Sequence, residues 1–406
     1  MRRPPMLIYA AALMLAGCMP PPTAPPGVVE SIPDEAAMIA RLANDRLGDQ
    51  ASALLFFSTA ERRVAFKHMD SILPTRPVSA GPAPSLLVNR PAELSAVTYE
   101  VEGTTYGLDD FLNRPAQIGL IVVKDGAIVL ERYAPGNDAG SLWVSFSVSK
   151  SVTSMLIGAA IQDGFIESVD EPITHYLPRL RGTGYEGATI RNILQMSSGV
   201  AWNEDYADPQ SDVARAGGAN GIELVRYLGQ LEREHEPGEV FNYNTGETNL
   251  VGEVLRAAIG NNAATYLSHK IWQPFGMESD ANWVTGGPGS GETGGCCISA
   301  TLRDYVRLGL FALNDGVLPD GKRVLPEGWM AESISPSKGA PFYGYLWWLD
   351  GDGRYVARGI FGQQIYIDPV DNIVIAAHGN ASAAVGTDYH EHLSAAIRAI
   401  AAAIRD

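Results

Sequence analysis

The chain is organised around the stretch Ser145-Phe146-Ser147-Val148-Ser149-Lys150-Ser151, which continues directly into residues 152–161. Residues 152–161 are apolar or small on nearly every side, which is the pattern of a helix buried in a core. A turn-like Pro135-Gly136-Asn137 lies before this stretch. The sequence therefore predicts a central, buried helix that opens at Ser147.

Ser147 and Lys150 are three residues apart, so they share one face of this helix, with Cβ atoms roughly 5–6 Å apart. A serine is a weak nucleophile unless a base accepts its proton, and a lysine is such a base only when it is neutral. Burial lowers the pKa of a lysine because desolvation disfavours the ammonium form. The N–H of a serine at a helix start also supplies half of an oxyanion hole. The pattern predicts a serine nucleophile with a lysine base; serines that only cap the helix are the alternative.

The composition suits a large globular enzyme. The 406 residues are 46% apolar and 19% charged, which is enough to bury a sizeable core in one domain with an insertion or in two domains. The net charge of −16 argues against nucleic acid as a partner and against adhesion to anionic lipid through surface charge.

The first residues form a targeting signal. Two arginines give a basic start, residues 6–16 form an apolar run too short to span a bilayer, and Leu15-Ala16-Gly17-Cys18 ends it. This ending resembles the lipobox of bacterial lipoproteins, which implies removal of residues 1–17 and acylation of the Cys18 thiol. The methionine after that cysteine is typical of lipoproteins sent to the outer membrane. We expect a proline-rich linker over residues 18–33 and a lipid anchor that faces the periplasm; an ordinary secretory signal is the alternative.

Only Cys296 and Cys297 remain once Cys18 is assigned to lipid. A disulfide between adjacent cysteines is strained, so we favour two reduced, packed thiols over a vicinal disulfide. The segment Asp388-Tyr389-His390-Glu391-His392 has the residue types of a metal site, yet it opens the C-terminal helix, where we expect a solvated first turn. The sequence thus predicts neither a metal nor a cofactor.

Strands are predicted near both ends of the sequence. Residues 117–123 and 127–132 flank Lys124-Asp125-Gly126, and a D-G turn between two β-branched runs is a strong hairpin signal. A C-terminal helix is predicted over residues 390–404. It follows three further predicted strands, over residues 354–357, 363–367 and 372–377.

This order indicates an α+β fold in which one antiparallel sheet is made from residues 100–146 and 340–406. A mainly helical region, residues 147–339, is inserted between these two parts. Residues 34–99 form an N-terminal helical arm. The glycine-rich residues 286–295 form a loop that we expect over a site.

Three segments then resemble a known superfamily. Residues 146–151, 189–199 and 237–246 come in the order of the motifs of the serine β-lactamase and penicillin-binding-protein superfamily, in its class C-like esterase branch. Residues 202–206 and 357–363 are similar to the 6-aminohexanoate-dimer (nylon-oligomer) hydrolase group. The resemblance covers roughly residues 100 to 405. It implies the α/β sandwich of β-lactamases and transpeptidases and hydrolysis of a small ester or amide through an acyl-enzyme.

The resemblance also implies roles for individual residues. Ser147 would be acylated, Lys150 would accept its proton, and Tyr243 would relay a proton to the leaving group. The N–H groups of Ser147 and Ile360 would form the oxyanion hole. Three further positions would contact the substrate, namely Tyr206, Gly359 and Asn244.

Two departures from the superfamily pattern bear on the substrate. Thr245 stands where the second motif usually has asparagine, and the third motif, usually begun by lysine or histidine, is Ala357-Arg358-Gly359. Alternate residues of a strand face opposite sides, so Arg358 would point away from the face of its two neighbours. Neutral esters or linear amides are therefore favoured. The alternatives are a β-lactamase or D-Ala-D-Ala carboxypeptidase and a non-hydrolytic penicillin-binding sensor.

Overall fold

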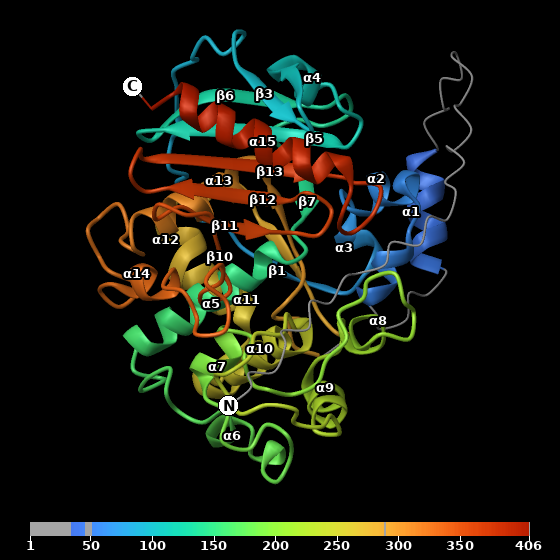
Figure 1. Ribbon diagram of the computed structural model, residues 1–406, viewed down its shortest axis with the longest axis vertical. Helices are drawn as coiled ribbons and strands as arrows, with labels where there is room; N and C mark the ends of the chain where they lie inside the picture. The colour runs from blue at the N-terminus through green and yellow to red at the C-terminus, as the bar shows by residue number, and fades with distance from the viewer. Residues whose placement is uncertain (1–33, 45–50, 288–289, 406) are drawn as a thin grey trace, which may run out of the picture.

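The computed structural model of the chain describes residues 34–44, 51–287 and 290–405. It has an α+β architecture in which a central sheet separates a terminal helix from a large helical region (Figure 1). The predicted signal, the linker and Cys18 lie outside the described residues. Among the described residues, no helix combines the length and the apolar character that crossing a bilayer requires.

The central sheet joins strands from the two ends of the fold, as predicted. Its seven strands run in the order β10-β11-β12-β13-β5-β6-β2, and β13 pairs with β5, with Ile375 opposite Val122. All neighbours are antiparallel except β2 and β6. The strands are β2 (Val88–Asn89), β5 (Gln117–Lys124), β6 (Ala127–Tyr133), β10 (Trp348–Leu349), β11 (Tyr355–Arg358), β12 (Gln364–Asp368) and β13 (Ile373–Gly379).

The D-G turn between β5 and β6 has the backbone that its sequence requires. Asp125 has φ of 50° and Gly126 has φ of 75°. Two consecutive positive φ angles define the type I′ turn, which matches the right-handed twist of the strands that it connects. The predicted hairpin is therefore confirmed, and it sets the register of the central strands.

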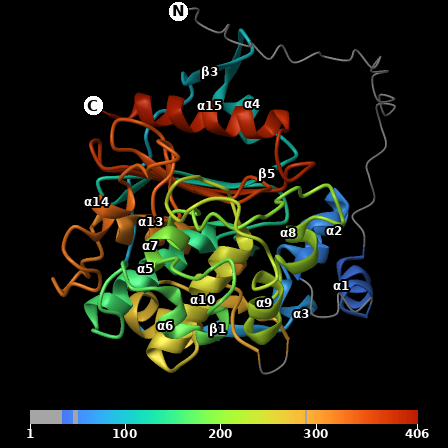
Figure 2. The same cartoon turned by 60° about the horizontal axis from the view of Figure 1, so that its bottom comes forward.

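Strand β5 is buried on both faces of the sheet. Leu120 and Val122 pack in the core beneath α15 (Asp388–Ala403), whereas Ile121 and Val123 pack in a second core with α13 (Leu302–Leu313) and the helical region. Figure 2 shows α15 on one side of the sheet and the helical region on the other. This arrangement explains why β5 reads as a continuous apolar run rather than an alternating one.

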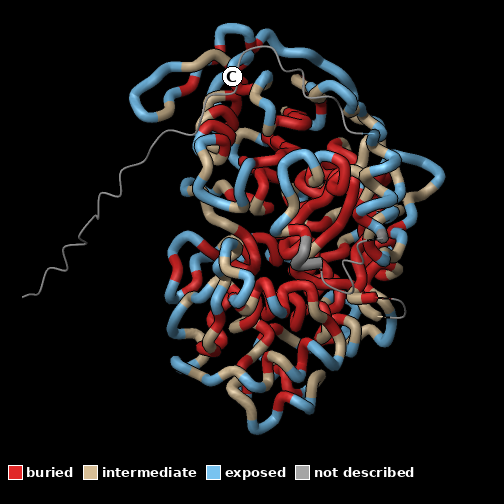
Figure 3. The backbone as a smooth tube through the Cα atoms, turned by 90° about the vertical axis from the view of Figure 1, so that its right-hand side faces the viewer, coloured by how far each residue is buried: buried red, intermediate tan, exposed pale blue. Residues whose placement is uncertain are grey.

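The helical region contains the predicted central helix, α5 (Val148–Gln162), which packs against α10 (Thr245–Ile259). Most residues of both helices are buried, and Figure 3 shows buried residues in the interior of the molecule and exposed ones on the outer loops. The other helices of the region are α6 (Ile173–Tyr176), α7 (Ile190–Leu194), α8 (Asp212–Ala216), α9 (Gly221–Leu228), α11 (Ala263–Leu267), α12 (Gln273–Phe275) and α14 (Trp329–Ser333), with short turns η2 (Pro178–Leu180) and η3 (Ser268–Trp272).

A second, four-stranded sheet, in the order β1-β8-β9-β7, is absent from the sequence prediction. Its strands are short, and β1 contains Pro77, which an edge strand tolerates because it needs no hydrogen bond on its outer side. Its strands are β1 (Thr75–Val78), β7 (Leu142–Val144), β8 (Ala281–Val284) and β9 (Ile298–Thr301), and a separate hairpin joins β3 (Thr98–Val101) to β4 (Thr104–Gly107), followed by α4 (Leu108–Leu112).

The N-terminal arm begins with helices that lie beside α8 at the edge of the molecule (Figure 1). Ser58 caps one of them with a capping box, because its hydroxyl accepts from the N–H of Glu61 and the Glu61 carboxylate accepts from the N–H of Ser58. These elements are α1 (Glu35–Asn44), η1 (Ala51–Phe56), α2 (Thr59–Ala65) and α3 (Met69–Ile72).

Candidate active site

Ser147 lies where strand β7 turns into α5. The turn depends on Phe146, whose φ of 44° is an unfavourable left-handed conformation for a bulky residue. The Ser147 hydroxyl makes no capping hydrogen bond to the helix. The capping alternative therefore does not apply to Ser147, and its side chain is free to face the adjacent pocket.

A small pocket opens in front of Ser147. Its walls come from the N-terminal arm, from the helical region and from the turn after β11. No side chain that lines it carries a charge. The lining residues are Leu55, Phe146, Ser147, Tyr206, Val213, Gly217, Thr245, Gly295, Cys296 and Ile360.

Lys150 is buried one helical turn behind Ser147, with 1% of its surface exposed. Burial lowers the pKa of its amine from 10.5 to about 8, while the negative charge of Glu204 acts in the opposite direction. Its Nζ donates to Thr245 Oγ1 at 3.0 Å and to the Gly295 carbonyl at 3.3 Å. A neutral amine has two N–H donors and one lone pair, so these two bonds leave the lone pair free to accept a proton.

Gly295 fits this arrangement because it lacks a side chain. A Cβ atom at this position would lie 2.8 Å from Lys150 Nζ and 3.0 Å from Asn249 Oδ1. The Gly295 N–H donates to the same Asn249 oxygen at 2.8 Å. The predicted glycine-rich loop thus reaches the site through one residue that holds the lysine amine.

Tyr243 lies next to both groups. Burial, together with the charge of Glu204, raises the pKa of its phenol, and a side-chain hydrogen bond with Ser147 acts in the opposite direction. Its ring centroid is 5.5 Å from Lys150 Nζ and 5.6 Å from the ring of Trp348, on which it stacks. Tyr243 is therefore a neutral phenol that can donate a proton, and Lys150 is the better base.

Glu204 is the main residue that sequence reasoning missed. Its Oε1 accepts a hydrogen bond from Thr245 Oγ1 and another from Tyr206 OH at 2.8 Å. Its Oε2 accepts from the Thr245 N–H at 3.0 Å and from the Trp202 indole. A chain of hydrogen bonds thus runs from Lys150 through Thr245 to Glu204. The signal was present in the alternate spacing of Trp202, Glu204 and Tyr206, but only the fold brings them to Thr245.

Ser147 and Ile360, whose backbone N–H groups are the predicted oxyanion hole, both line the same pocket. Among the described residues neither N–H has a hydrogen-bond acceptor, which is the state required of an oxyanion hole before substrate binds. The Ile360 carbonyl accepts from His390 Nε2 at 3.0 Å. A Cβ atom on Gly359 would lie 2.5 Å from the Ser145 carbonyl oxygen. Gly359 therefore lets the backbone approach the residues around Ser147, and it does not line the pocket.

Asn244 and Arg358 also lie away from the pocket lining. Asn244 is completely buried, and its Oδ1 caps α10 by accepting from the Glu247 N–H at 2.9 Å. The structure therefore does not bring its side chain to a substrate. Arg358 lies over the ring of Trp348 at 5.8 Å and pairs with Asp350 at 3.8 Å. Its predicted orientation away from the site is confirmed.

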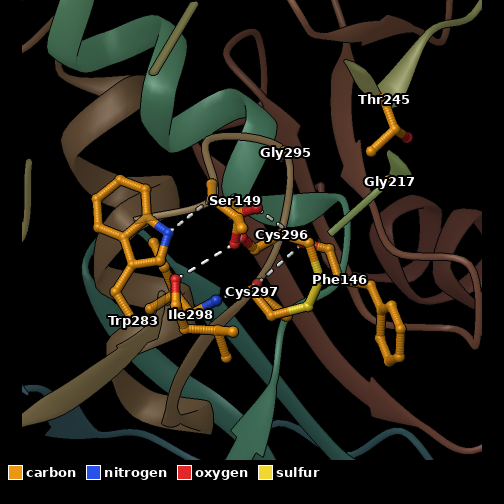
Figure 4. Close-up of a disulfide and its surroundings, with 12 residues drawn as sticks. Phe146, Ser149, Gly217, Thr245, Trp283, Gly295, Cys296, Cys297 and Ile298 are labelled. Atoms are coloured by element: carbon orange, nitrogen blue, oxygen red, sulfur yellow. Dashed lines mark hydrogen bonds between the residues drawn. A yellow bond between two sulfur atoms is a disulfide. The ribbon is translucent and has the colours of Figure 1, made fainter. Parts of the chain in front are cut away.

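Cys296 and Cys297 form a disulfide, so the prediction of two reduced thiols is wrong. Figure 4 shows the disulfide beside Phe146, and Cys296 and Phe146 both line the pocket in front of Ser147. The expected strain between adjacent cysteines therefore did not exclude the bond, since the structure brings both sulfur atoms together.

The predicted solvated turn at residues 388–392 is wrong for its histidines, although Asp388 and Glu391 are exposed. His392 is 3% exposed and its Nδ1 forms a hydrogen bond with Tyr99 OH at 2.9 Å. His390 is tied to Thr387 and to Ile360. These histidines are packed structural groups because α15 lies on the core of the sheet, which the local sequence does not reveal. Among the described residues, no group of three or more His, Cys, Asp or Glu side chains is arranged to hold a metal ion.

Comparison with known proteins places this geometry in a family. The family model described as Beta-lactamase matches residues 113–398. The chain therefore belongs to the beta-lactamase family and is a serine hydrolase, and the predicted β-lactamase/transpeptidase-like fold is confirmed.

Individual proteins of known name are also similar to this chain. The chain is 27% identical over 338 residues to 6-aminohexanoate-dimer hydrolase from Paenarthrobacter ureafaciens, covering 77% of this chain and 84% of that protein. A Bacillus anthracis structure provisionally named a 6-aminohexanoate-dimer hydrolase has a TM-score of 0.73 at 24% identity, covering 84% of this chain and 93% of that one. A family VIII carboxylesterase has a TM-score of 0.53 at 16% identity, covering 70% and 93%. The two structures show the shared fold.

Proposed function

We propose that the protein hydrolyses an ester or a small linear amide through an acyl-enzyme on Ser147. Lys150 takes the Ser147 proton as Oγ attacks the substrate carbonyl carbon. The N–H groups of Ser147 and Ile360 hold the resulting oxyanion. Tyr243 gives its proton to the leaving oxygen or nitrogen and regains one from the Lys150 ammonium.

Deacylation uses the same groups in the reverse direction. A water molecule attacks the acyl carbon and gives a proton to the neutral Lys150 amine. The carbonyl re-forms, the bond to Ser147 Oγ breaks, and that oxygen regains its proton through Tyr243. The carboxylic acid leaves and Ser147 is restored, so every proton is accounted for by side chains of this chain and by water.

The observation that carries the proposal is the state of Lys150. Its pKa of about 8 leaves a useful neutral fraction near neutral pH, and its two donated hydrogen bonds leave the lone pair available. A structural lysine would normally face a carboxylate directly or reach solvent. Lys150 does neither, because its bonds end on a hydroxyl and a carbonyl.

The uncharged pocket supports a neutral acyl group. The curated relative is named for a linear amide substrate and a structural neighbour is a carboxylesterase. Arg358 is absent from the lining, so the pocket offers no side-chain cation to the carboxylate of a β-lactam or a D-Ala-D-Ala peptide. Esters and linear amides are therefore the favoured substrates over these alternatives.

A fluorophosphonate label tests the nucleophile. We expect one modified peptide, the one that contains Ser147, and no labelling of Ser147→Ala. The wild-type protein should cleave p-nitrophenyl esters faster than nitrocefin. Modification of another serine would overturn the assignment, rapid nitrocefin turnover with little ester cleavage would favour a β-lactamase, and an acyl adduct that persists for hours would favour a binding sensor.

We also propose that a lipid on Cys18 anchors the protein to the outer membrane, facing the periplasm. The support is the sequence Leu15-Ala16-Gly17-Cys18 after an apolar run. Mass spectrometry of the mature N-terminus should find an acylated cysteine, and Cys18→Ala should move the protein out of the membrane fraction. An unmodified Cys18 in wild-type protein would contradict the anchor and leave the hydrolase proposal intact.

A further inference from the structure

We infer that the helices of the N-terminal arm contribute residues to the active site. Leu55 limits the length of the acyl group, and Phe66 positions the oxyanion hole. We call η1, α2 and α3, residues 51–72, the arm helices. They lie outside residues 113–398, which the family model matches. The inference rests on the proposed function of Ser147.

Leu55 forms part of the pocket wall in front of Ser147. Its neighbour Leu54 is completely buried, which fixes η1 to the body of the protein. The same turn contacts α8, whose Val213 lines the pocket beside Leu55. One aliphatic wall of the pocket is therefore built by two segments, of which one belongs to the arm helices.

Phe66 touches the two residues that flank the oxyanion hole. Its ring centroid is 4.9 Å from that of Phe146 and 5.5 Å from that of Phe361. Phe146 immediately precedes Ser147, and Phe361 immediately follows Ile360. The rings of Phe146 and Phe361 are themselves 5.0 Å apart, so the three aromatic side chains form one cluster.

The aromatic cluster also helps to hold the backbone conformation around Ser147. Phe146 has the left-handed φ of 44°, which persists only where the surroundings enforce it. The Phe66 carbonyl accepts from the Val144 N–H at 2.9 Å, so the arm also holds the strand that leads into Ser147. Removing the Phe66 ring should therefore loosen the relative placement of the two oxyanion N–H groups.

Arg62 fixes the arm helices to the rest of the fold. Its buried guanidinium donates to the carbonyls of Phe57 at 2.6 Å, Ala381 at 2.8 Å and Ser382 at 2.9 Å. It also lies 4.4 Å from the Phe361 ring centroid. These contacts link the arm to the loop that follows β13, which makes it a fixed wall of the site.

The size role is tested by acyl-chain preference. We expect Leu55→Ala to raise the ratio of kcat/KM for p-nitrophenyl octanoate to that for p-nitrophenyl acetate by about tenfold, and Leu55→Trp to lower it by a similar factor. The neighbouring exposed Phe56 provides the control, because Phe56→Ala should leave the ratio unchanged. An unchanged ratio in both Leu55 variants would overturn this role.

The positioning role is tested by Phe66→Leu against Phe311→Leu, which removes the same volume from a completely buried site on α13. We expect Phe66→Leu to lower kcat on the order of 10-fold to 100-fold with KM nearly unchanged. Phe311→Leu should lower the thermal midpoint without this loss of kcat. Equal effects of the two variants on kcat would overturn the positioning role and show that Phe66 only stabilises the fold.

These outcomes remain separate from the proposed function. Fluorophosphonate labelling of Ser147 in the wild-type protein tests the nucleophile directly. If Ser147 is not labelled, the proposed function fails. If Ser147 is labelled and esters are cleaved, but neither Leu55 nor Phe66 variants behave as expected, only the inference about the arm helices fails.

Discussion

The two regions that meet at Ser147 are built from opposite kinds of side chain. Between α5 and α10, Lys150 and Thr245 are polar groups buried with hydrogen-bond partners. The arm helices approach the same serine with apolar groups, Leu55 and Phe66. Burying an amine lowers the stability of the fold, whereas burying aromatic and aliphatic surface raises it. The polar region therefore sets the chemistry, and the apolar region holds it in place.

The largest effect should follow from removing the polar side of this comparison at Lys150. Lys150→Met keeps the length of the side chain but removes the base, so kcat/KM should fall by about 10³-fold to 10⁴-fold. In the wild type, kcat/KM should rise with pH and level off above about 8, where the pKa of Lys150 lies. A stopped-flow or steady-state pH profile with a neutral ester checks both statements.

The same variant should reveal the free-energy cost of the buried amine. Between pH 8 and 10.5 the native protein has released the Lys150 proton, because its pKa is lowered to about 8, while the unfolded chain still binds it. Stability must therefore rise with pH in this window. At about 1.4 kcal/mol per pH unit, the free energy of unfolding of wild type relative to Lys150→Met should rise by about 3 kcal/mol. Urea unfolding at both pH values measures it, and a constant difference would contradict a neutral lysine.

A smaller effect is expected from Glu204, which supports Lys150 through Thr245. The charge of Glu204 raises the pKa of Lys150, so Glu204→Gln should move the pH profile of kcat/KM toward lower pH. Its plateau should fall by about tenfold because Thr245 is held less firmly. The adjacent exposed Asp205 gives the control, since Asp205→Asn should leave the profile in place. A profile that moves toward higher pH would refute this role.

The sequence predicted the structural features that depend only on residues close together in the chain. The serine-lysine spacing, the apolar helix after it and the turn at Asp125 and Gly126 each follow from neighbouring residues, and the structure has all three. The joining of both ends in one sheet followed from two sets of strands on either side of a helical region.

The elements that the sequence did not predict depend on contacts between distant segments. Glu204 reaches Thr245 across 41 positions of the chain, and Phe66 reaches Phe361 only in the folded protein. Asn244 was misplaced because its type suits a helix cap as well as a substrate contact, and the buried Glu247 N–H decides between them. Spacing specifies which groups share one element, but packing specifies which elements share a site.

The smallest effect should come from Arg358, which lies outside both regions. Its guanidinium lies over the ring of Trp348, and that ring stacks on Tyr243. Arg358 can therefore affect the position of Tyr243 only indirectly, through Trp348. Arg358→Gln should change kcat/KM for a neutral ester by less than about threefold, because the half-buried Arg358 pairs with Asp350 at 3.8 Å and does not line the pocket. Trp348→Leu should lower kcat/KM further by freeing Tyr243. If Arg358 instead held a substrate carboxylate, Arg358→Gln would selectively abolish turnover of a carboxylate-bearing substrate such as nitrocefin. Parallel assays of the ester and nitrocefin with the two variants therefore decide whether Arg358 binds substrate or only packs on Trp348.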